Sequence, residues 1–247
     1  MRARYDHVEA LLKIKNRTAV QTALDHLLDM LRLNRSDNMG LRALVPALCL
    51  RLNKDQQAYD FLKWWYTTAT DDHYDWGNID LPRLDIVNAD ASEPLQTLNM
   101  EYSDLSHRAM LFLLKWRLQS GLQALDSACV IAGDKVPSEL LTQIRLQMLS
   151  SAAQNNVTLM RDVEHGRDIE GHIGQLAQQS DILFDALSDA NKCYWATLAE
   201  PGDHLTARPP HYSQGTVSEM QLSLSQTYDA WVETPGALEW VKSKVAA

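Results

Sequence analysis

Residues 18–33 read TAVQTALDHLLDMLRL, a stretch in which apolar side chains return every three or four positions. This spacing places them on one face and predicts an amphipathic α-helix that packs on a core. Residues 34–40, NRSDNMG, are turn-forming and end that helix. A second helix with spaced leucines follows, and Pro46 within it predicts either a kink or a late start.

Most of the remaining chain continues as helices joined by short turns, which force neighbouring helices to pack as antiparallel hairpins. Two such helices are expected over residues 103–118 and 122–132, separated at Gly121. Residues 70–102 break the pattern with glycine, prolines and many acidic residues, and predict one long acidic loop. No segment alternates as a β-strand does, so the chain is predicted to be all-α.

We interpret the chain as a single all-helical domain, residues 1–247. Its hydrophobic and charged fractions, 45% and 22%, are ordinary for a globular protein that buries a core. The expected parts are a helix-pair unit in 1–69, the long loop in 70–102, helix pairs in 103–190 and a C-terminal helical cap in 191–247.

The net charge of the chain indicates which classes of partner it can bind. Lys and Arg number 23 against 32 Asp and Glu, giving a net charge of -9, and no basic stripe offsets it, so nucleic acid is not an expected partner. The longest apolar runs are too short to span a bilayer, and no signal-peptide pattern follows Met1. We therefore expect no membrane insertion and a cytoplasmic or nuclear location. Three isolated cysteines are too few for a zinc finger.

Residues 31–58 end one helix in a small polar turn, begin the next with spaced leucines, and place Ala58 where two helices approach closely. This segment resembles the junction between tetratricopeptide repeats of about 34 residues. With YDWG at 74–77, YW at 194–195, HYSQG at 211–215 and AWVETPGAL at 230–238, the chain is similar to tetratricopeptide-like proteins of fungi and bacteria. These are distantly similar to the suppressor of tumorigenicity seven family. The resemblance implies stacked antiparallel helix hairpins, a short α-solenoid, and no established enzymatic activity.

Residues 71–75, DDHYD, match the D-D-x-x-D pattern with which terpene cyclases and prenyltransferases hold magnesium on a diphosphate. Clustered carboxylates suit that cation, so Asp71, Asp72 and Asp75 are candidate magnesium ligands. The second metal motif of those enzymes is incomplete, because Lys192 stands where its glutamate belongs. A solvated acidic loop is the favoured interpretation, and a magnesium site is the alternative.

Aromatic residues flank this cluster. Trp64, Tyr66 and Trp76 are candidate contacts for a partner, because aromatic side chains are enriched in binding hot spots. The favoured alternative is that Trp65 packs in the hairpin core and Trp64 covers the loop, since a tryptophan buries a large area.

A second polar cluster comprises His165, Asp168 and His172, whose spacing would place them on one face of a continuous helix, like metal ligands. Gly171 and Gly174 make that helix doubtful. A polar, solvated face is therefore the favoured interpretation.

These observations favour a non-enzymatic scaffold that binds a peptide or protein in a helical-repeat groove, without a cofactor. The alternative is an unorthodox all-α enzyme that acts on an isoprenoid diphosphate with magnesium held by Asp71, Asp72 and Asp75. A homodimer joined through the polar middle region is a third hypothesis, which light scattering tests.

Overall fold

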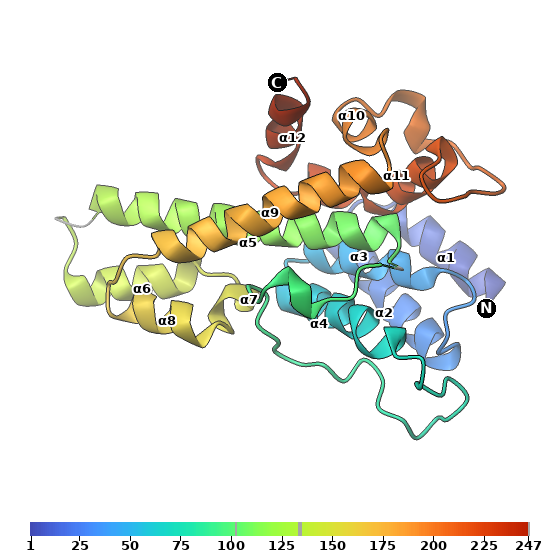
Figure 1. The fold of residues 1–247 in the computed structure, drawn as a ribbon, viewed down its shortest axis with the longest axis horizontal. Helices are drawn as coiled ribbons and strands as arrows, with labels where there is room; N and C mark the ends of the chain where they lie inside the picture. The colour runs from blue at the N-terminus through green and yellow to red at the C-terminus, as the bar shows by residue number, and fades with distance from the viewer. Residues whose placement is uncertain (102, 133–134, 247) are drawn as a thin grey trace.

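The computed structural model describes residues 1–101, 103–132 and 135–246, and these form α-helices and short 3-10 helices without a β-strand (Figure 1). The prediction of an all-α chain is confirmed for the described residues. The α-helices are α1 (Arg2–Leu12), α2 (Arg17–Leu33), α3 (Val45–Arg51), α4 (Asp55–Tyr66), α5 (Leu105–Ala132), α6 (Ser138–Met148), α7 (Ser151–Gln154), α8 (Val157–Glu164), α9 (Glu170–Ala190), α10 (Tyr194–Ala199), α11 (Val217–Val232) and α12 (Ala237–Val245). The 3-10 helices are η1 (Leu41–Ala43), η2 (Thr68–Thr70), η3 (Leu95–Thr97) and η4 (Gly202–Leu205).

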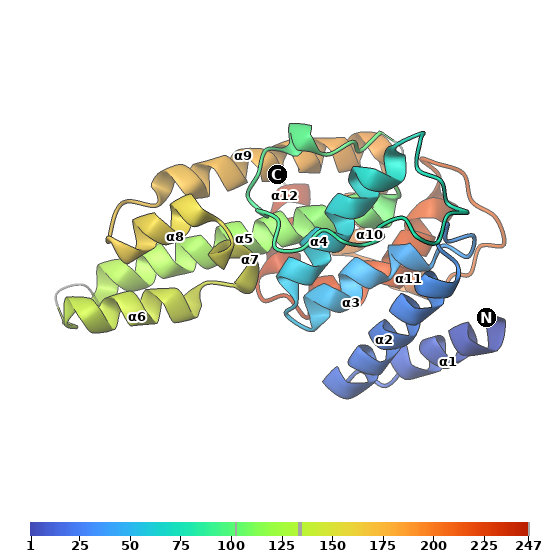
Figure 2. The same ribbon diagram turned by 90° about the horizontal axis from the view of Figure 1, so that it is seen from below.

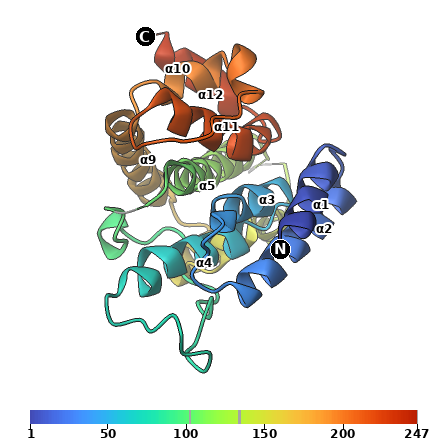
Figure 3. The same cartoon turned by 90° about the vertical axis from the view of Figure 1, so that its right-hand side faces the viewer.

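The centre of the fold is α5, whose 28 residues span about 42 Å at the usual helical rise. Figure 3 shows it between α2–α4 on one side and α9–α12 on the other, and it contacts α3, α4, α9 and α11. Residues 109–114, an unbroken apolar run, are all fully buried because neighbours cover this helix all round. Among the described helices, none combines the length and apolarity needed to cross a membrane.

The first four helices pack in chain order, α1 on α2, α2 on α3 and α3 on α4 (Figure 2). The Asn16 side chain caps α2 by accepting the Ala19 N–H at 2.8 Å. The late start predicted from Pro46 is confirmed. The chain first forms η1, and Pro46 then lies in the first turn of α3, where a missing N–H leaves no helical hydrogen bond unmade.

The expected break at Gly121 was wrong, because α5 continues through it. Glycine costs a helix interior about 1 kcal/mol relative to alanine. Here Leu118, Leu122 and Leu125 are buried on either side of it, and α9 packs along the same helix. Tertiary burial therefore outweighs the local preference of one glycine.

The second polar cluster does not share a helix face. His172 lies in α9, which accommodates Gly171 and Gly174, whereas His165 and Asp168 precede that helix. The His172 Nε2 atom instead lies 2.9 Å from a carboxylate oxygen of Asp162 in α8. The cluster is thus divided between a helix and the preceding turn.

The long loop is present as predicted. No α-helix forms among the described residues between η2 and α5, and η3 is a single short turn. The expected loop boundary at residue 102 lies outside the described residues. The loop is not wholly solvated, because Ala91, Leu95 and Leu98 are buried against the helices.

Candidate functional site

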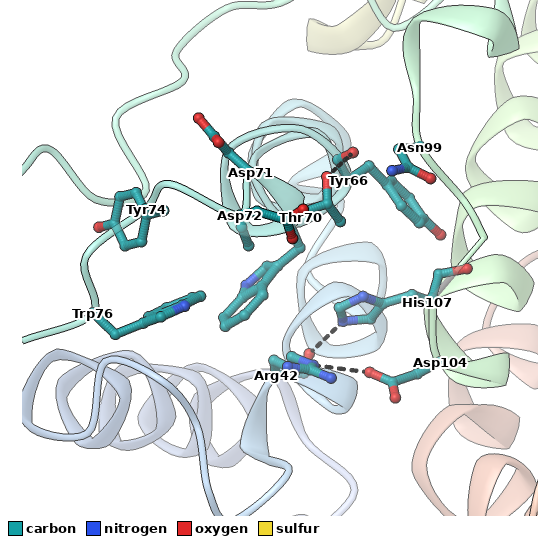
Figure 4. Close-up of a pocket in the computed structure, with 13 residues that line it drawn as sticks. Arg42, Tyr66, Thr70, Asp71, Asp72, Tyr74, Trp76, Asn99, Asp104 and His107 are labelled. Carbon is teal, nitrogen blue, oxygen red and sulfur yellow. Dashed lines mark hydrogen bonds and ion pairs between the residues drawn. The ribbon is translucent and has the colours of Figure 1, made fainter.

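A cleft of about 450 Å³ opens where α4 ends, between η2, the first residues of the long loop and the beginning of α5 (Figure 4). We call it the α4 cleft. It lies where three chain segments meet, so its residues come from distant parts of the sequence. Figure 4 shows Tyr74 and Trp76 on one side and Asp104 and His107 on the other.

One wall of the α4 cleft is aromatic. Trp65 and Tyr66 come from the last turn of α4, and Tyr74 and Trp76 come from the loop. The rings of Trp65 and Trp76 stack with centroids 5.8 Å apart, and Tyr74 meets Trp76 edge-on at 4.9 Å. These contacts hold the loop against the end of α4 and leave Tyr74 and Trp76 half-buried.

The opposite side contains a half-buried ion pair and a buried histidine. The Arg42 Nε atom donates to a carboxylate oxygen of Asp104 at 2.9 Å, and the His107 Nε2 atom donates to the Arg42 carbonyl oxygen at 3.0 Å. Burial lowers the pKa of His107, which favours its neutral form. Burial opposes ionisation of Asp104, but His107 and Arg42 together lower its pKa. The Arg42 charge is thus neutralised within the wall.

The Arg42 side chain also covers an aromatic face, with its guanidinium carbon 4.8 Å from the centre of the Trp65 ring. The indole N–H of Trp65 is buried and has no hydrogen-bond partner among the described residues. A buried donor left unpaired costs stability.

The candidate magnesium ligands are separated by the loop geometry. Asp71 and Asp72 are exposed and line the α4 cleft, but Asp75 does not line it. The Asp75 carboxylate instead accepts the Gly77 N–H at 2.9 Å. Among the described residues, no group of three or more His, Cys, Asp or Glu side chains is placed to hold a metal ion.

The three candidate partner contacts differ in whether they line the α4 cleft. Tyr66 and Trp76 line the α4 cleft. Trp64 does not, because its side chain is fully buried and its indole N–H donates to Asp85 at 3.1 Å. Trp64 is therefore a core residue, and Tyr74 and Trp76 of the loop pack edge-on against its ring.

The sequence reasoning did not single out Arg42, Asp104 and His107 as site residues. One signal was present for His107. It lies beside the apolar run at 109–114, and a helix that is apolar all round is buried all round. A titratable residue next to such a run is expected to be buried and paired, which is its environment here.

Comparison of the chain with known protein families, with curated proteins and with solved structures finds no match.

Proposed function

We propose that the protein is a non-enzymatic interaction module that binds a peptide segment of a partner protein in the α4 cleft. The observation that carries the proposal is the open, aromatic-walled cleft of about 450 Å³. Concave sites of this size with aromatic walls and a few polar groups are typical binding sites, and aromatic anchors dominate the energy of protein interfaces. Trp76 and Tyr74 are such anchors, because each is held by ring contacts while part of it stays exposed.

The proposal includes a tetratricopeptide-like origin for the first helices. Its support is the packing of α1 to α4 in chain order, which is how successive helices of a repeat array contact each other. The α4 cleft then lies at one end of this stack, where α4 passes into the long loop.

A cleft-blocking variant tests the function. Ala69 lines the α4 cleft, so Ala69→Trp fills it. The matched control is Ala124→Trp, which makes the same change at an exposed position of α5 outside the cleft. A phage-displayed library of random peptides is selected on the wild-type protein, and the affinity of the enriched peptides is measured by fluorescence polarisation.

We expect the enriched peptides to bind the wild type and Ala124→Trp equally and Ala69→Trp about tenfold or more weakly, the effect of losing a hot-spot contact. Circular dichroism checks that both variants are folded. Equal binding to all three proteins would show that the cleft is not the site. A library that yields no enriched sequence would remove the peptide-binding proposal.

One observation favours a second candidate function. Two of the three candidate magnesium ligands, Asp71 and Asp72, line a cleft with aromatic walls, as an enzyme acting on an isoprenoid diphosphate would require. It is the weaker proposal because Asp75, the third carboxylate of the motif, does not line the cleft. A thermal-shift titration with magnesium, with and without an isoprenoid diphosphate, separates the two, since a ligand of the folded state raises the unfolding midpoint. A shift that needs both components would favour the enzyme.

A further inference from the structure

The charges that line the α4 cleft leave a negative excess at its mouth. Four formally charged residues line it, and Arg42 and Asp104 neutralise each other across 2.9 Å. The remaining two are Asp71 and Asp72, and neither forms an ion pair with any described residue. A positively charged group is therefore the complement that this cleft lacks.

The aromatic cluster points to the same chemistry. Three neighbouring tryptophans form it, and two of them have an arginine over the ring: Arg42 lies 4.8 Å from the Trp65 centroid and Arg83 lies 5.8 Å from the Trp64 centroid. Trp76, which contacts both of these tryptophans, has no cation over its ring among the described residues. It is also the one that stays half-exposed. One face of its ring stacks on Trp65, so the opposite face is the one that a cation can contact.

We infer that the partner segment is basic, and that it places an arginine or lysine side chain between the Trp76 ring and the carboxylates of Asp71 and Asp72. The inference rests on the proposed function and adds the chemistry of the partner. The apolar stem of such a side chain packs on the aromatic wall while its charged end meets the carboxylates. The net charge of -9 on the whole chain attracts a basic segment from a distance and disfavours an acidic one.

A metal ion is the alternative occupant beside Asp71 and Asp72. The role of Asp75 distinguishes a metal ion from a basic side chain. A D-D-x-x-D metal site needs Asp75, whereas the inferred contact does not, because Asp75 faces its own turn outside the cleft. Asp75→Asn is therefore the matched control for the double variant Asp71→Asn/Asp72→Asn. Its amide oxygen retains the acceptor for the Gly77 N–H while the charge is removed.

The probes are octapeptides of glycine and serine with two central arginines, lysines, glutamines or glutamates. Each is titrated into ¹⁵N-labelled full-length protein, and the indole N–H signal of Trp76 reports binding. We expect the arginine and lysine peptides to shift this signal, and the glutamine peptide to bind about five- to thirtyfold more weakly, as the loss of one cation–π contact and exposed ion pairs requires.

The double variant Asp71→Asn/Asp72→Asn is expected to weaken binding of the arginine peptide about two- to fivefold per carboxylate, and Asp75→Asn to leave it unchanged. Added salt weakens the same binding, because the carboxylates are exposed. Equal binding of the glutamine and arginine peptides would overturn the inference. So would a magnesium-induced shift of the Trp76 signal that requires Asp75 as well as Asp71 and Asp72.

The outcomes also separate this inference from the proposed function. If the peptides enriched on the α4 cleft are neutral or acidic and still depend on an open cleft, the interaction module stands and the basic partner does not. If Ala69→Trp has no effect on any peptide, both fall together.

Discussion

The two halves of the long loop have similar acidic compositions but are held by different means. In residues 71–84, Asp71, Asp75 and Asn78 each accept the backbone N–H two residues further on, so the chain bends through successive local turns. The tertiary hydrogen bonds of this half come mainly from Arg35, whose guanidinium donates to the Tyr74 hydroxyl and to backbone carbonyls at 2.8–3.0 Å.

In residues 85–98, by contrast, helix side chains hold the backbone itself. Asp60 in α4 accepts the N–H groups of Asn88 and Ala89, each at 2.9 Å. Lys115 in α5 donates to the Glu93 carbonyl oxygen at 3.0 Å, and Gln179 in α9 donates to a neighbouring carbonyl at the same distance. The backbone of this half is therefore fixed by the helices, although its only regular element is the short 3-10 helix η3.

The two halves show that the amino-acid composition of a loop does not decide whether the loop is exposed to solvent or bonded to the helices. A segment held by its own turns keeps its carboxylates exposed, and they remain available to a ligand. A segment whose peptide groups are paired with buried side chains becomes part of the packed structure, because an unpaired buried peptide group is costly. The α4 cleft is built from the first kind.

The largest loss of stability is expected from replacing Trp64, which contacts both halves of the loop. This fully buried side chain packs against Tyr74 and Trp76 and donates to Asp85. Trp64→Ala is expected to lower the free energy of unfolding by about 3–5 kcal/mol, the usual cost of a large cavity. Chemical denaturation measures it. The control Trp76→Ala, at a half-buried position, should cost much less, and equal losses would contradict the division.

A smaller effect is expected from releasing the second half alone. Asp60→Ala removes the acceptor of two backbone N–H groups and should lower the free energy of unfolding by about 1–3 kcal/mol. Hydrogen exchange should show faster exchange at the amides of Asn88 and Ala89. The comparable change in the first half, Asp75→Ala, removes one exposed local bond and should cost less than about 0.5 kcal/mol. If both variants lose the same stability, the two halves are not held differently.

The third effect is that the free energy of unfolding depends on pH through Lys115, which is fully buried beside Glu93. Burial lowers its pKa to about 7, against the opposing influence of Glu93 and Asp90. Above that pH the unfolded chain binds one proton more than the folded protein, so the stability contributed at Lys115 rises with pH. The free energy of unfolding of wild type relative to Lys115→Met should rise by about 1 kcal/mol between pH 7 and 8.

Denaturation curves of both proteins at a series of pH values test this prediction. Below pH 7 the difference between them should become constant, because Lys115 is then protonated in both states. A difference that stays constant up to pH 9 would show that Lys115 keeps its proton in the fold.

The smallest effect on stability is expected from the two cleft carboxylates. Asp71→Asn/Asp72→Asn should change the free energy of unfolding by no more than about 0.5 kcal/mol, because both side chains are exposed and outside ion pairs. Thermal unfolding measures this. A larger loss would mean that these carboxylates support the fold, and any binding defect of the variant would then need a structural explanation.

The sequence predicted the helical class and much of the first half well, because α2, α3 and α4 have periodic apolar faces and clear turns between them. Of the six candidate residues singled out from the sequence, four line the cleft, namely Asp71, Asp72, Tyr66 and Trp76. Trp64 and Asp75 were grouped with them because they are neighbours in sequence. One side chain is buried and the other faces its own turn, and adjacency alone does not reveal that.

What the sequence determined by itself is therefore local: where helices begin, which faces are apolar, and where the chain turns. Only the tertiary structure decided which partners the buried and half-buried charged residues received. Arg42 pairs with Asp104, and Lys115 donates to the backbone carbonyl oxygen of Glu93, because α5 packs against α3 and α4. Apolar periodicity specifies one face of each element, whereas the pairing of polar groups depends on which elements that face brings together.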